Sequence, residues 1–343
     1  MKAAVLTKPK TIEIQDVPDP KPAPHEVLIR VKTVGICGSD LHYYEHGRIG
    51  TQVVEYPFIL GHEVGGEIAE VGSNVKGFEP GDKIAIEPQQ TCGKCEFCKS
   101  GRYNLCPHVK FLATPPVNGA FAEYITHPAD MTFKLPDTMD YEQGALLEPL
   151  AIGFHVSDRA EASLGERVLI TGAGCIGLVI LLALKAKGLS EIYVSDVLDN
   201  RLAMARELGA REVFRADRTD PVKEILKRTD GRGADIVIEA SGNPKAIAGT
   251  VDAVRRGGKI LMLGYAPTDS VEFDFKKLIF KEASLNTSRR YCNMYPLAID
   301  AVANGLVDIS KCVTHRWNFD QASVAMDFSI NNKQEITKGV IQI

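Results

Sequence analysis

Four cysteines lie close together in one short segment of this chain. The segment TCGKCEFCKSGRYNLC has the spacing C-x2-C-x2-C-x7-C, formed by Cys92, Cys95, Cys98 and Cys106. Paired C-x2-C steps bring thiolates near enough to share one tetrahedral ion, and zinc is the usual occupant. Flanking Gly93 and Gly101 allow tight backbone turns around that ion. Because four cysteines fill every position of such an ion, we expect this zinc to brace a surface lobe.

A second set of possible metal ligands precedes the four-cysteine segment. Cys37 lies in GICGSDLH, and His62 and Glu63 lie in ILGHEVGGE. Three separated ligands that leave one coordination position open are typical of a catalytic zinc site. Each residue alone has an ordinary alternative, namely a buried thiol, a core histidine or a surface glutamate. Their joint occurrence beside the cysteine segment favours a catalytic metal.

A glycine-rich loop indicates a nucleotide site. The segment TGAGCIG follows an apolar strand and opens a helix, with the pattern G-x-G-x-x-G at Gly172, Gly174 and Gly177. Asp196 follows Gly177 by 19 residues, at the end of the next strand. This context predicts a dinucleotide site in which the helix N-terminus faces the pyrophosphate and Asp196 selects NAD over NADP. Asp196 could instead cap the next turn, and Arg201 could stack on adenine or be solvated.

The pattern of strands and helices divides the chain into two domains. The first half is rich in short Val- and Ile-containing strands, as in EVLIRVKTVGIC and EVGGEIAEVG. From residue 167 five apolar strands alternate with helices, which favours a doubly wound parallel sheet. The last strand-like piece, KGVIQI, could rejoin the first sheet. We therefore expect an α/β protein with a discontinuous catalytic domain, residues 1–150 and 286–343, and a nucleotide-binding domain, residues 151–285.

Composition excludes several classes of function. The net charge is −4, so nothing favours nucleic acid or an anionic membrane. The first 17 residues contain no long apolar core, and the longest apolar run, near IGLVILLALKAKG, is too short to span a bilayer. We expect a cytoplasmic protein that has no nucleic-acid or membrane partner. Three further cysteines, Cys175, Cys292 and Cys312, are expected to be ordinary buried thiols.

The order of these motifs resembles a known family. GICGSD, GHE, the cysteine segment and GAGCIG occur together in the zinc-dependent medium-chain dehydrogenases, and the resemblance covers essentially the whole chain. CGSDLHYYEHGRIG, FLATPPVNGAFAEY, LLEPLAIGFH and RYCNMYP resemble the polyol branch, of the sorbitol dehydrogenase type. The resemblance implies a GroES-like catalytic domain, a Rossmann domain, NAD, two zinc ions per subunit and a homotetramer. It also implies a catalytic zinc held by Cys37, His62 and Glu63, with Glu148 nearby through water.

The resemblance further implies roles for individual residues. For catalysis it implies Ser39 as the first proton acceptor and the carboxylate of Glu148. His42 could pass the proton outward, since a neutral imidazole suits proton transfer near pH 7, or could be a surface histidine. Along the cofactor it places Gly172, Gly174, Ile176, Gly177, Asp196, Arg201, Leu263, Gly264, Tyr265, Ser288, Arg289 and Arg290. Against the polyol it places Tyr43, Phe111, Thr114, Glu148, Arg290 and Tyr291. Two residues depart from the usual pattern: Cys175 stands where relatives often have proline, and Arg289 where they often have an apolar residue.

These features predict an enzyme that oxidises a secondary hydroxyl of a polyol to a ketose, with zinc as Lewis acid and NAD as hydride acceptor. Within enzymes, the alternative is a threonine- or butanediol-type dehydrogenase on the same scaffold. From a different class, the alternative is a zinc-stabilised nucleotide sensor without catalysis. Such a sensor would need the glycine loop and the cysteine segment, but not Cys37, Ser39, His62, Glu63 and Glu148 together.

Overall fold

The computed structural model describes residues 1–268 and 270–343, and these form two compact units. Unit 1 comprises Met1–Glu148 and Tyr295–Ile343, and unit 2 comprises Pro149–Met294. The boundary expected between residues 285 and 286 falls inside strand β18 (Ser284–Thr287). Because β18 pairs with the sheet of unit 2, the chain stays in that unit as far as Met294.

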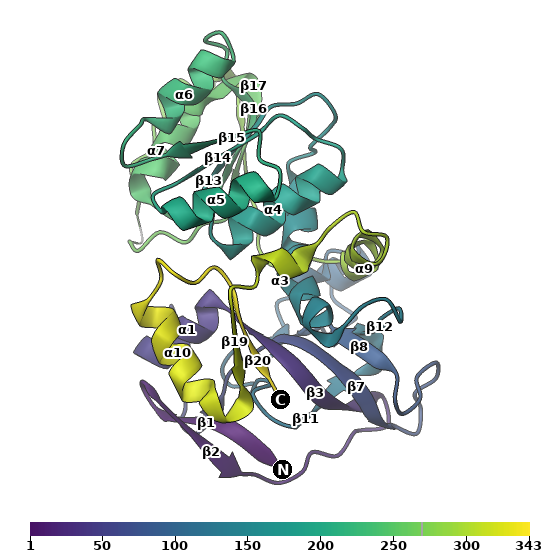
Figure 1. The fold of residues 1–343 in the computed structure, drawn as a ribbon. Coiled ribbons are helices and arrows are strands. Elements are labelled where there is room, and N and C mark those ends of the chain that lie inside the picture. Colours follow the sequence, from purple (N-terminus) through teal and green to yellow (C-terminus); the bar gives the residue numbers. More distant parts are fainter. Residues whose placement is uncertain (269) are drawn as a thin grey trace. The chain divides into compact units, whose positions relative to one another are not determined.

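Unit 1 is rich in strands, and its main sheet brings distant parts of the sequence together. Among the described residues, this sheet follows the order β12 (Thr132–Lys134), β8 (Lys83–Ile86), β7 (Glu63–Val71), β3 (Glu26–Ile36), β20 (Gly339–Gln342) and β19 (His315–Asn318), with β11 (Tyr124–Pro128) paired to β3. The segment predicted to rejoin this sheet is β20, which lies antiparallel to β3 (Figure 1). Alternate residues Val27, Ile29 and Val31 of β3 point into the core of unit 1.

Shorter elements complete unit 1. A small sheet consists of β2 (Thr11–Asp16), β1 (Lys2–Lys8) and β6 (Phe58–Ile59), and two ribbons consist of β4 (Arg48–Ile49) with β5 (Gln52–Val53) and β9 (Gln89–Gln90) with β10 (Lys110–Phe111). The helices are α1 (Gly38–His46), α2 (Glu96–Lys99), α9 (Tyr295–Ala303), α10 (Ala322–Asn331) and the first part of α3 (Tyr141–Arg159). Helix α1 begins directly after β3, which places the start of a helix beside a sheet end.

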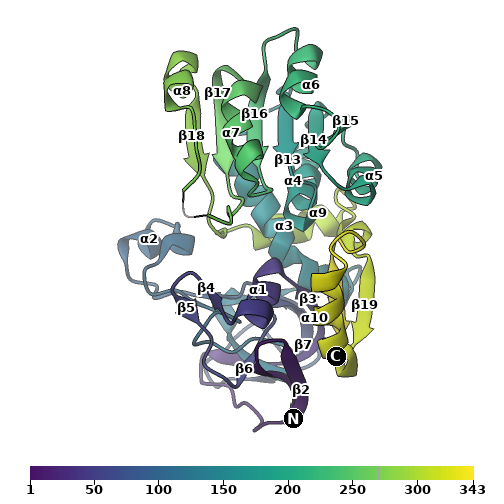
Figure 2. The ribbon, with the colours of Figure 1, turned by 90° about the vertical axis from the view of Figure 1, so that its left-hand side faces the viewer.

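Unit 2 contains the doubly wound parallel sheet that the alternation predicted. Its strands follow the order β15 (Glu212–Arg215), β14 (Ile192–Asp196), β13 (Val168–Thr171), β16 (Ala234–Glu239), β17 (Val254–Met262) and β18, all parallel (Figure 2). The helices are α4 (Cys175–Ala186), α5 (Asp199–Glu207), α6 (Pro221–Arg228), α7 (Pro244–Ala253) and α8 (Phe275–Lys281). β13 and β16 are buried along their whole length, as continuous apolar strands between two helix layers require. The strand order reverses beside β13, where such folds bind their ligands.

Two details of unit 2 differ from the sequence prediction. The segment NPKAIAGTVDAVRRGG between two of the strands predicts a helix that ends at its final glycines, but α7 ends at Ala253 because the chain passes directly into β17 at Val254. The parallel sheet also has a sixth strand, β18, beyond the five predicted. The segment SLNT is short and largely exposed, so no apolar run marks it as a strand.

Candidate active site

The predicted catalytic ligands come together at one end of the main sheet of unit 1. Cys37 directly follows β3, while His62 and Glu63 stand at the start of β7. β3 and β7 are antiparallel neighbours, with Gly35 paired to Glu63. One ligand atom from each of Cys37, His62 and Glu63 lies within 4.8 Å of the others. Sulfur, imidazole nitrogen and carboxylate oxygen at this spacing fit a zinc ion with one position left for substrate.

Asp40 supports this group, although sequence reasoning did not select it. Its carboxylate accepts the backbone N–H of Cys37 at 3.0 Å and that of Gly61 at 3.0 Å. Its Oδ1 atom also lies 3.5 Å from Nδ1 of His62. Because Nδ1 faces Asp40, Nε2 is the ring nitrogen available to a metal. The one signal for Asp40 was its position three residues after Cys37, where it closes a capping box at the start of α1.

Lys338 also contacts the ligand group, and nothing in the local sequence predicted it. Its ammonium group forms an ion pair with the carboxylate of Glu63 and donates to the carbonyl of Ile36 at 3.1 Å. Lys338 immediately precedes β20, which is paired to β3. The C-terminal strand therefore brings a cation to the metal ligands from 275 residues along the chain.

Glu148 lies in α3 of unit 1, where its side chain is buried. Among the described residues, it does not belong to the group whose ligand atoms lie within 4.8 Å of one another. Its negative charge acts on Glu87. Burial raises the pKa of Glu87 to about 7, and repulsion from Glu148 contributes a smaller part. Glu87 accepts hydrogen bonds from Tyr103 at 3.0 Å and from Gln89 at 2.9 Å. Two buried carboxylates thus interact with each other, and one of them is hydrogen-bonded to Tyr103, which lies between the last two cysteines of the four-cysteine segment.

The two residues of the expected proton relay lie in the first two turns of α1. Ser39 is half-buried two residues after Cys37, and His42 is exposed one turn further on. Although His42 is exposed by surface area, partial desolvation of its ring by neighbouring groups lowers its pKa, and the nearby His46 and Lys333 lower it further. His42 is therefore neutral near pH 7, as a side chain that both accepts and donates a proton must be.

The residues expected to contact the polyol are divided between the two units. In unit 1, the ring of Phe111 packs edge-on against His62 with centroids 5.3 Å apart. Tyr43 is buried, and its hydroxyl donates to Gln52 at 3.2 Å. Thr114 lies in the loop after β10 and forms an isolated bridge with Val117. Arg290 and Tyr291 belong to unit 2, where Tyr291 is buried and Arg290 has a φ of 52°.

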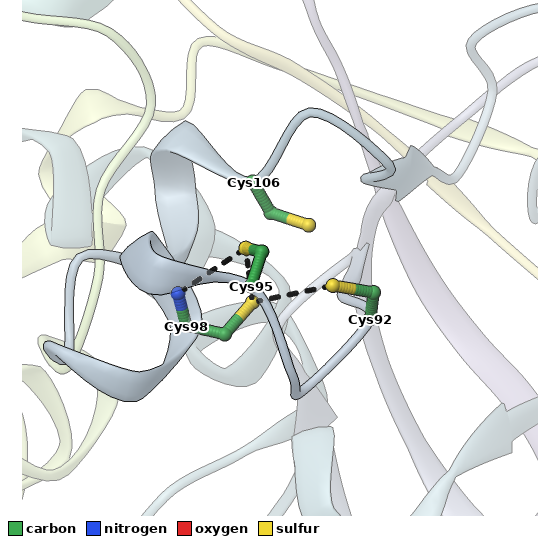
Figure 3. A group of neighbouring side chains, drawn as sticks. All are labelled: Cys92, Cys95, Cys98 and Cys106. Atoms are coloured by element: carbon green, nitrogen blue, oxygen red, sulfur yellow. Dashed lines mark hydrogen bonds between the residues drawn. The ribbon is translucent and has the colours of Figure 1, made fainter.

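The four-cysteine segment forms a compact group of its own. Its sulfur atoms lie within 4.8 Å of one another and face a common centre (Figure 3). The Sγ atom of Cys98 is 3.4 Å from that of Cys95 and 3.9 Å from that of Cys92. Backbone N–H groups of Lys94 and Cys95 lower the pKa of Cys92 to about 6, which favours the thiolate form that binds metal. The group fits a closed, structural zinc site.

The glycine loop of unit 2 has the geometry of a phosphate cradle. Gly172 has a φ of +97°, and a Cβ there would lie 2.9 Å from the backbone of Ser241. A Cβ on Gly177 would lie 1.9 Å from the carbonyl oxygen of Gly172, so only glycine permits this close contact between helix and strand. Gly174 is the N-cap of α4, and Cys175 and Ile176 are its first two residues. The first amides of α4 thus face the space that a pyrophosphate would take.

Asp196 ends β14 beside this loop. Its Oδ2 atom accepts the N–H of Ala173 at 2.7 Å, and its Oδ1 atom accepts those of Val197 at 2.7 Å and Leu198 at 3.0 Å. The turn-capping role considered from the sequence is therefore present. A carboxylate has about four acceptor positions, so one remains for a ribose hydroxyl. Arg201 lies 4.0 Å from the carboxylate.

The remaining residues expected along the cofactor lie at or near the carboxyl ends of β17 and β18. Leu263 and Gly264 donate their backbone N–H groups to the carbonyl of Glu239. Tyr265 and Arg289 are exposed, and Ser288 is half-buried. All five belong to unit 2, at the sheet edge where a parallel fold binds its ligands.

Comparisons with known proteins agree with this geometry. Residues 23–137 match the family model described as an alcohol dehydrogenase GroES-like domain, and residues 175–304 match a zinc-binding dehydrogenase model. The chain is 44% identical to a sorbitol dehydrogenase of Bacillus subtilis over 99% of this chain and 97% of that protein. It is 39% identical to the human sorbitol dehydrogenase over 94% of this chain and 91% of that protein.

Solved structures give the same result. An Escherichia coli oxidoreductase of unknown specificity has a TM-score of 0.96 and 42% identity, covering 100% of this chain and 99% of that one. A zinc-binding dehydrogenase from Sinorhizobium meliloti bound to NADP has a TM-score of 0.92 and 30% identity, with the same coverage. An Escherichia coli alcohol dehydrogenase in complex with NADH has a TM-score of 0.93 and 28% identity, again with the same coverage. In the part of the chain that the structure describes, no helix is long and apolar enough to cross a membrane.

Proposed function

Since the chain belongs to the zinc-dependent medium-chain dehydrogenases, in their polyol branch, we propose that it oxidises a secondary hydroxyl of a five- or six-carbon polyol to a ketose with NAD. The observation that carries the proposal is the group of Cys37, His62 and Glu63, which is three-membered and mixed in donor type, with Cys37 half-buried and the other two residues buried. Zinc held there would polarise the substrate hydroxyl and lower its pKa. NAD would accept the hydride.

The chain's own residues then handle the proton. Ser39, two residues after Cys37, would accept the proton of the substrate hydroxyl. His42, one helical turn further along α1, passes it outward, because its lowered pKa keeps the imidazole neutral near pH 7. Glu148 stays one water away from the metal. A third anionic ligand would give the site a net charge of −1 and reduce its attraction for an anionic oxygen.

The substrate residues suit a sugar alcohol better than a simple alcohol. Tyr43, Thr114, Arg290 and Tyr291 offer hydroxyl and guanidinium groups, and Glu148 offers a carboxylate. A site that pairs with several substrate hydroxyls rejects an analogue that lacks them. Phe111 packs against His62 and closes one side of the ligand group with an apolar ring. We therefore expect much lower kcat/KM for ethanol than for a polyol.

Unit 2 is proposed as the NAD-binding domain. Gly172, Gly174, Ile176 and Gly177 would hold the pyrophosphate. Asp196 would accept a bond from the adenosine ribose and repel the extra phosphate of NADP. Arg201 would lie against the adenosine. The rest of the cofactor would lie along Leu263, Gly264, Tyr265, Ser288, Arg289 and Arg290.

We also propose a homotetramer that works in the cytoplasm. Among the residues that the structure describes, β18 is the last strand at one edge of the parallel sheet, and Leu285 on that strand is 40% exposed. Beside it, Phe275, Ile279 and Phe280 of α8 are all exposed. A two-fold axis at this edge would pair β18 with a second copy and cover these apolar side chains. The thiol ligands of both metal sites favour a reducing compartment.

A substrate panel tests the proposed activity. NADH absorbance is followed after adding NAD or NADP with D-sorbitol, xylitol, galactitol, 2,3-butanediol, threonine or ethanol. The proposal expects turnover with at least one polyol and NAD, and its loss in Cys37→Ala. Turnover confined to threonine or butanediol would select the alternative enzyme. No turnover with any substrate, together with tight nucleotide binding, would select the sensor.

A further inference from the structure

The carboxylate of Glu63 is paired with a cation of the protein itself, the ammonium group of Lys338. The ammonium group of Lys338 pairs with both oxygens of Glu63 and donates to the carbonyl of Ile36 at 3.1 Å. Glu63 is 1% exposed and Lys338 is 3% exposed. A charged pair that is removed from water persists only with close contact and further hydrogen bonds, and this pair has both.

The main sheet makes room for this pair. β3 lies between β7, which carries Glu63, and β20, which directly follows Lys338. On the middle strand, Gly35 is paired to Glu63 and Ile36 is paired to Gly339. A Cβ at Gly35 would lie 1.9 Å from Oε2 of Glu63. The ion pair therefore crosses three strands at the one point where the middle strand has no side chain.

This placement puts two cations on one carboxylate. An oxygen of Glu63 lies within 4.8 Å of the ligand atoms of Cys37 and His62, so the carboxylate faces both the metal position and Lys338. The thiolate of Cys37 and the carboxylate of Glu63 balance the charge of a divalent ion. Lys338 adds a positive charge in a buried site, where charges are poorly screened, and it offsets the buried carboxylate of Asp40, which lies 3.5 Å from Nδ1 of His62.

Resting on the zinc site proposed above, we propose that Lys338 is a positioning residue that competes with zinc for Glu63. Lys338 fixes the carboxylate in the place where the metal meets it. It also withdraws part of the carboxylate's negative charge from the metal. The site is then one unit of charge more positive than it would be without the lysine, which favours an anionic oxygen on the substrate. Lys338 therefore lowers the affinity of the site for zinc and makes the bound zinc a stronger electrophile.

The test compares Lys338→Met with Lys338→Arg, and Lys311→Met serves as a matched control at an exposed lysine of the same unit. Zinc affinity is measured by competition with a coloured chelator, and Cys37→Ser identifies which of the two zinc ions is released. Lys338→Met should hold the catalytic zinc at least tenfold more tightly, with kcat for the polyol at least tenfold lower. Lys338→Arg should restore both values. A folded Lys338→Met with unchanged or weaker zinc affinity overturns the proposal.

A second pair of variants applies if Lys338→Met does not fold. Glu63→Gln leaves the lysine beside the metal without its carboxylate, so zinc affinity should fall at least a hundredfold. Adding Lys338→Met in that background removes the unpaired positive charge beside the metal, so zinc affinity should recover at least tenfold, and no recovery refutes the proposed effect of the Lys338 charge on the metal. A native protein without zinc at Cys37 would instead refute the proposed function. Native zinc binding that is insensitive to Lys338 would refute only this inference.

Discussion

Replacing Asp196 by asparagine tests how the chain chooses its cofactor. The aspartate is anchored by three backbone N–H groups at 2.7–3.0 Å, so its charge is fixed beside the glycine loop. Asparagine removes the charge, and its carbonyl oxygen can still accept the bonds from Val197 and Leu198. The variant therefore changes the electrostatics of the ribose site and preserves most of the turn.

The expected magnitude follows from Coulomb's law. Two unit charges about 5 Å apart, at an effective dielectric constant of about 20, repel by about 3 kcal/mol, which corresponds to more than a hundredfold in an equilibrium constant. The ribose of NAD loses a charge-assisted hydrogen bond, which costs about 1 kcal/mol, or several-fold. Asp196→Asn should therefore reduce the ratio of kcat/KM for NAD over NADP by about several hundredfold, mainly by raising the value for NADP.

The assay measures kcat/KM for both cofactors at a saturating polyol concentration and low salt. Asp230→Asn, at an exposed position of unit 2, is the matched control and should leave the ratio unchanged. Asp196→Ala should shift the ratio in the same direction and also lower the melting temperature, because all three N–H groups lose their acceptor. If folded Asp196→Asn keeps the native ratio within threefold, Asp196 does not select the cofactor.

Three further predictions concern metal, pH and assembly. Cys95→Ser should lose one of two zinc ions and lower the melting temperature by roughly 10 °C, while the folded fraction still oxidises polyol; retention of both ions by metal analysis would contradict this. The raised pKa of Glu87 means that the folded state keeps a proton that the unfolded state releases, so stability falls as the pH rises from 4.5 to about 7. Glu87→Gln should abolish this pH-dependent loss, which is about 3 kcal/mol of unfolding free energy. If denaturant unfolding shows the same change in that free energy between pH 5 and 7.5 for the native protein and the variant, the prediction is refuted. Leu285→Asp should convert a tetramer to smaller species by light scattering; an unchanged mass would exclude the β18 edge.

The fold was largely predictable because its signals are local. A few consecutive residues are enough to indicate an apolar strand, an intervening helix or a glycine turn. The sequence therefore predicted five of the six strands described in the parallel sheet of unit 2. β18 was missed because an edge strand of four mostly exposed residues needs no apolar pattern. The unit boundary moved to Met294 for the same reason.

The candidate metal site was predictable only as far as its ligands. Cysteine, histidine and glutamate are recognisable as possible metal ligands from their residue types alone. The structure does bring Cys37, His62 and Glu63 together. Asp40 has no metal-site signal in the sequence, since an aspartate three residues after Cys37 at the start of α1 has an ordinary capping role. Lys338 could not be found locally, because its position depends on how β20 pairs with β3. Support for a site often comes from strand pairing, which motif spacing does not encode.

The discontinuity of unit 1 has a consequence for synthesis on the ribosome. Unit 2 is one continuous segment, so it can fold as soon as it has emerged. The main sheet of unit 1 has to wait for β20, which is translated after the whole of unit 2. Until then Glu63 lacks its lysine, and β3 has an open edge where β20 will pair. Nascent chains stalled before residue 338 should therefore display a finished nucleotide fold beside an incomplete, aggregation-prone metal domain.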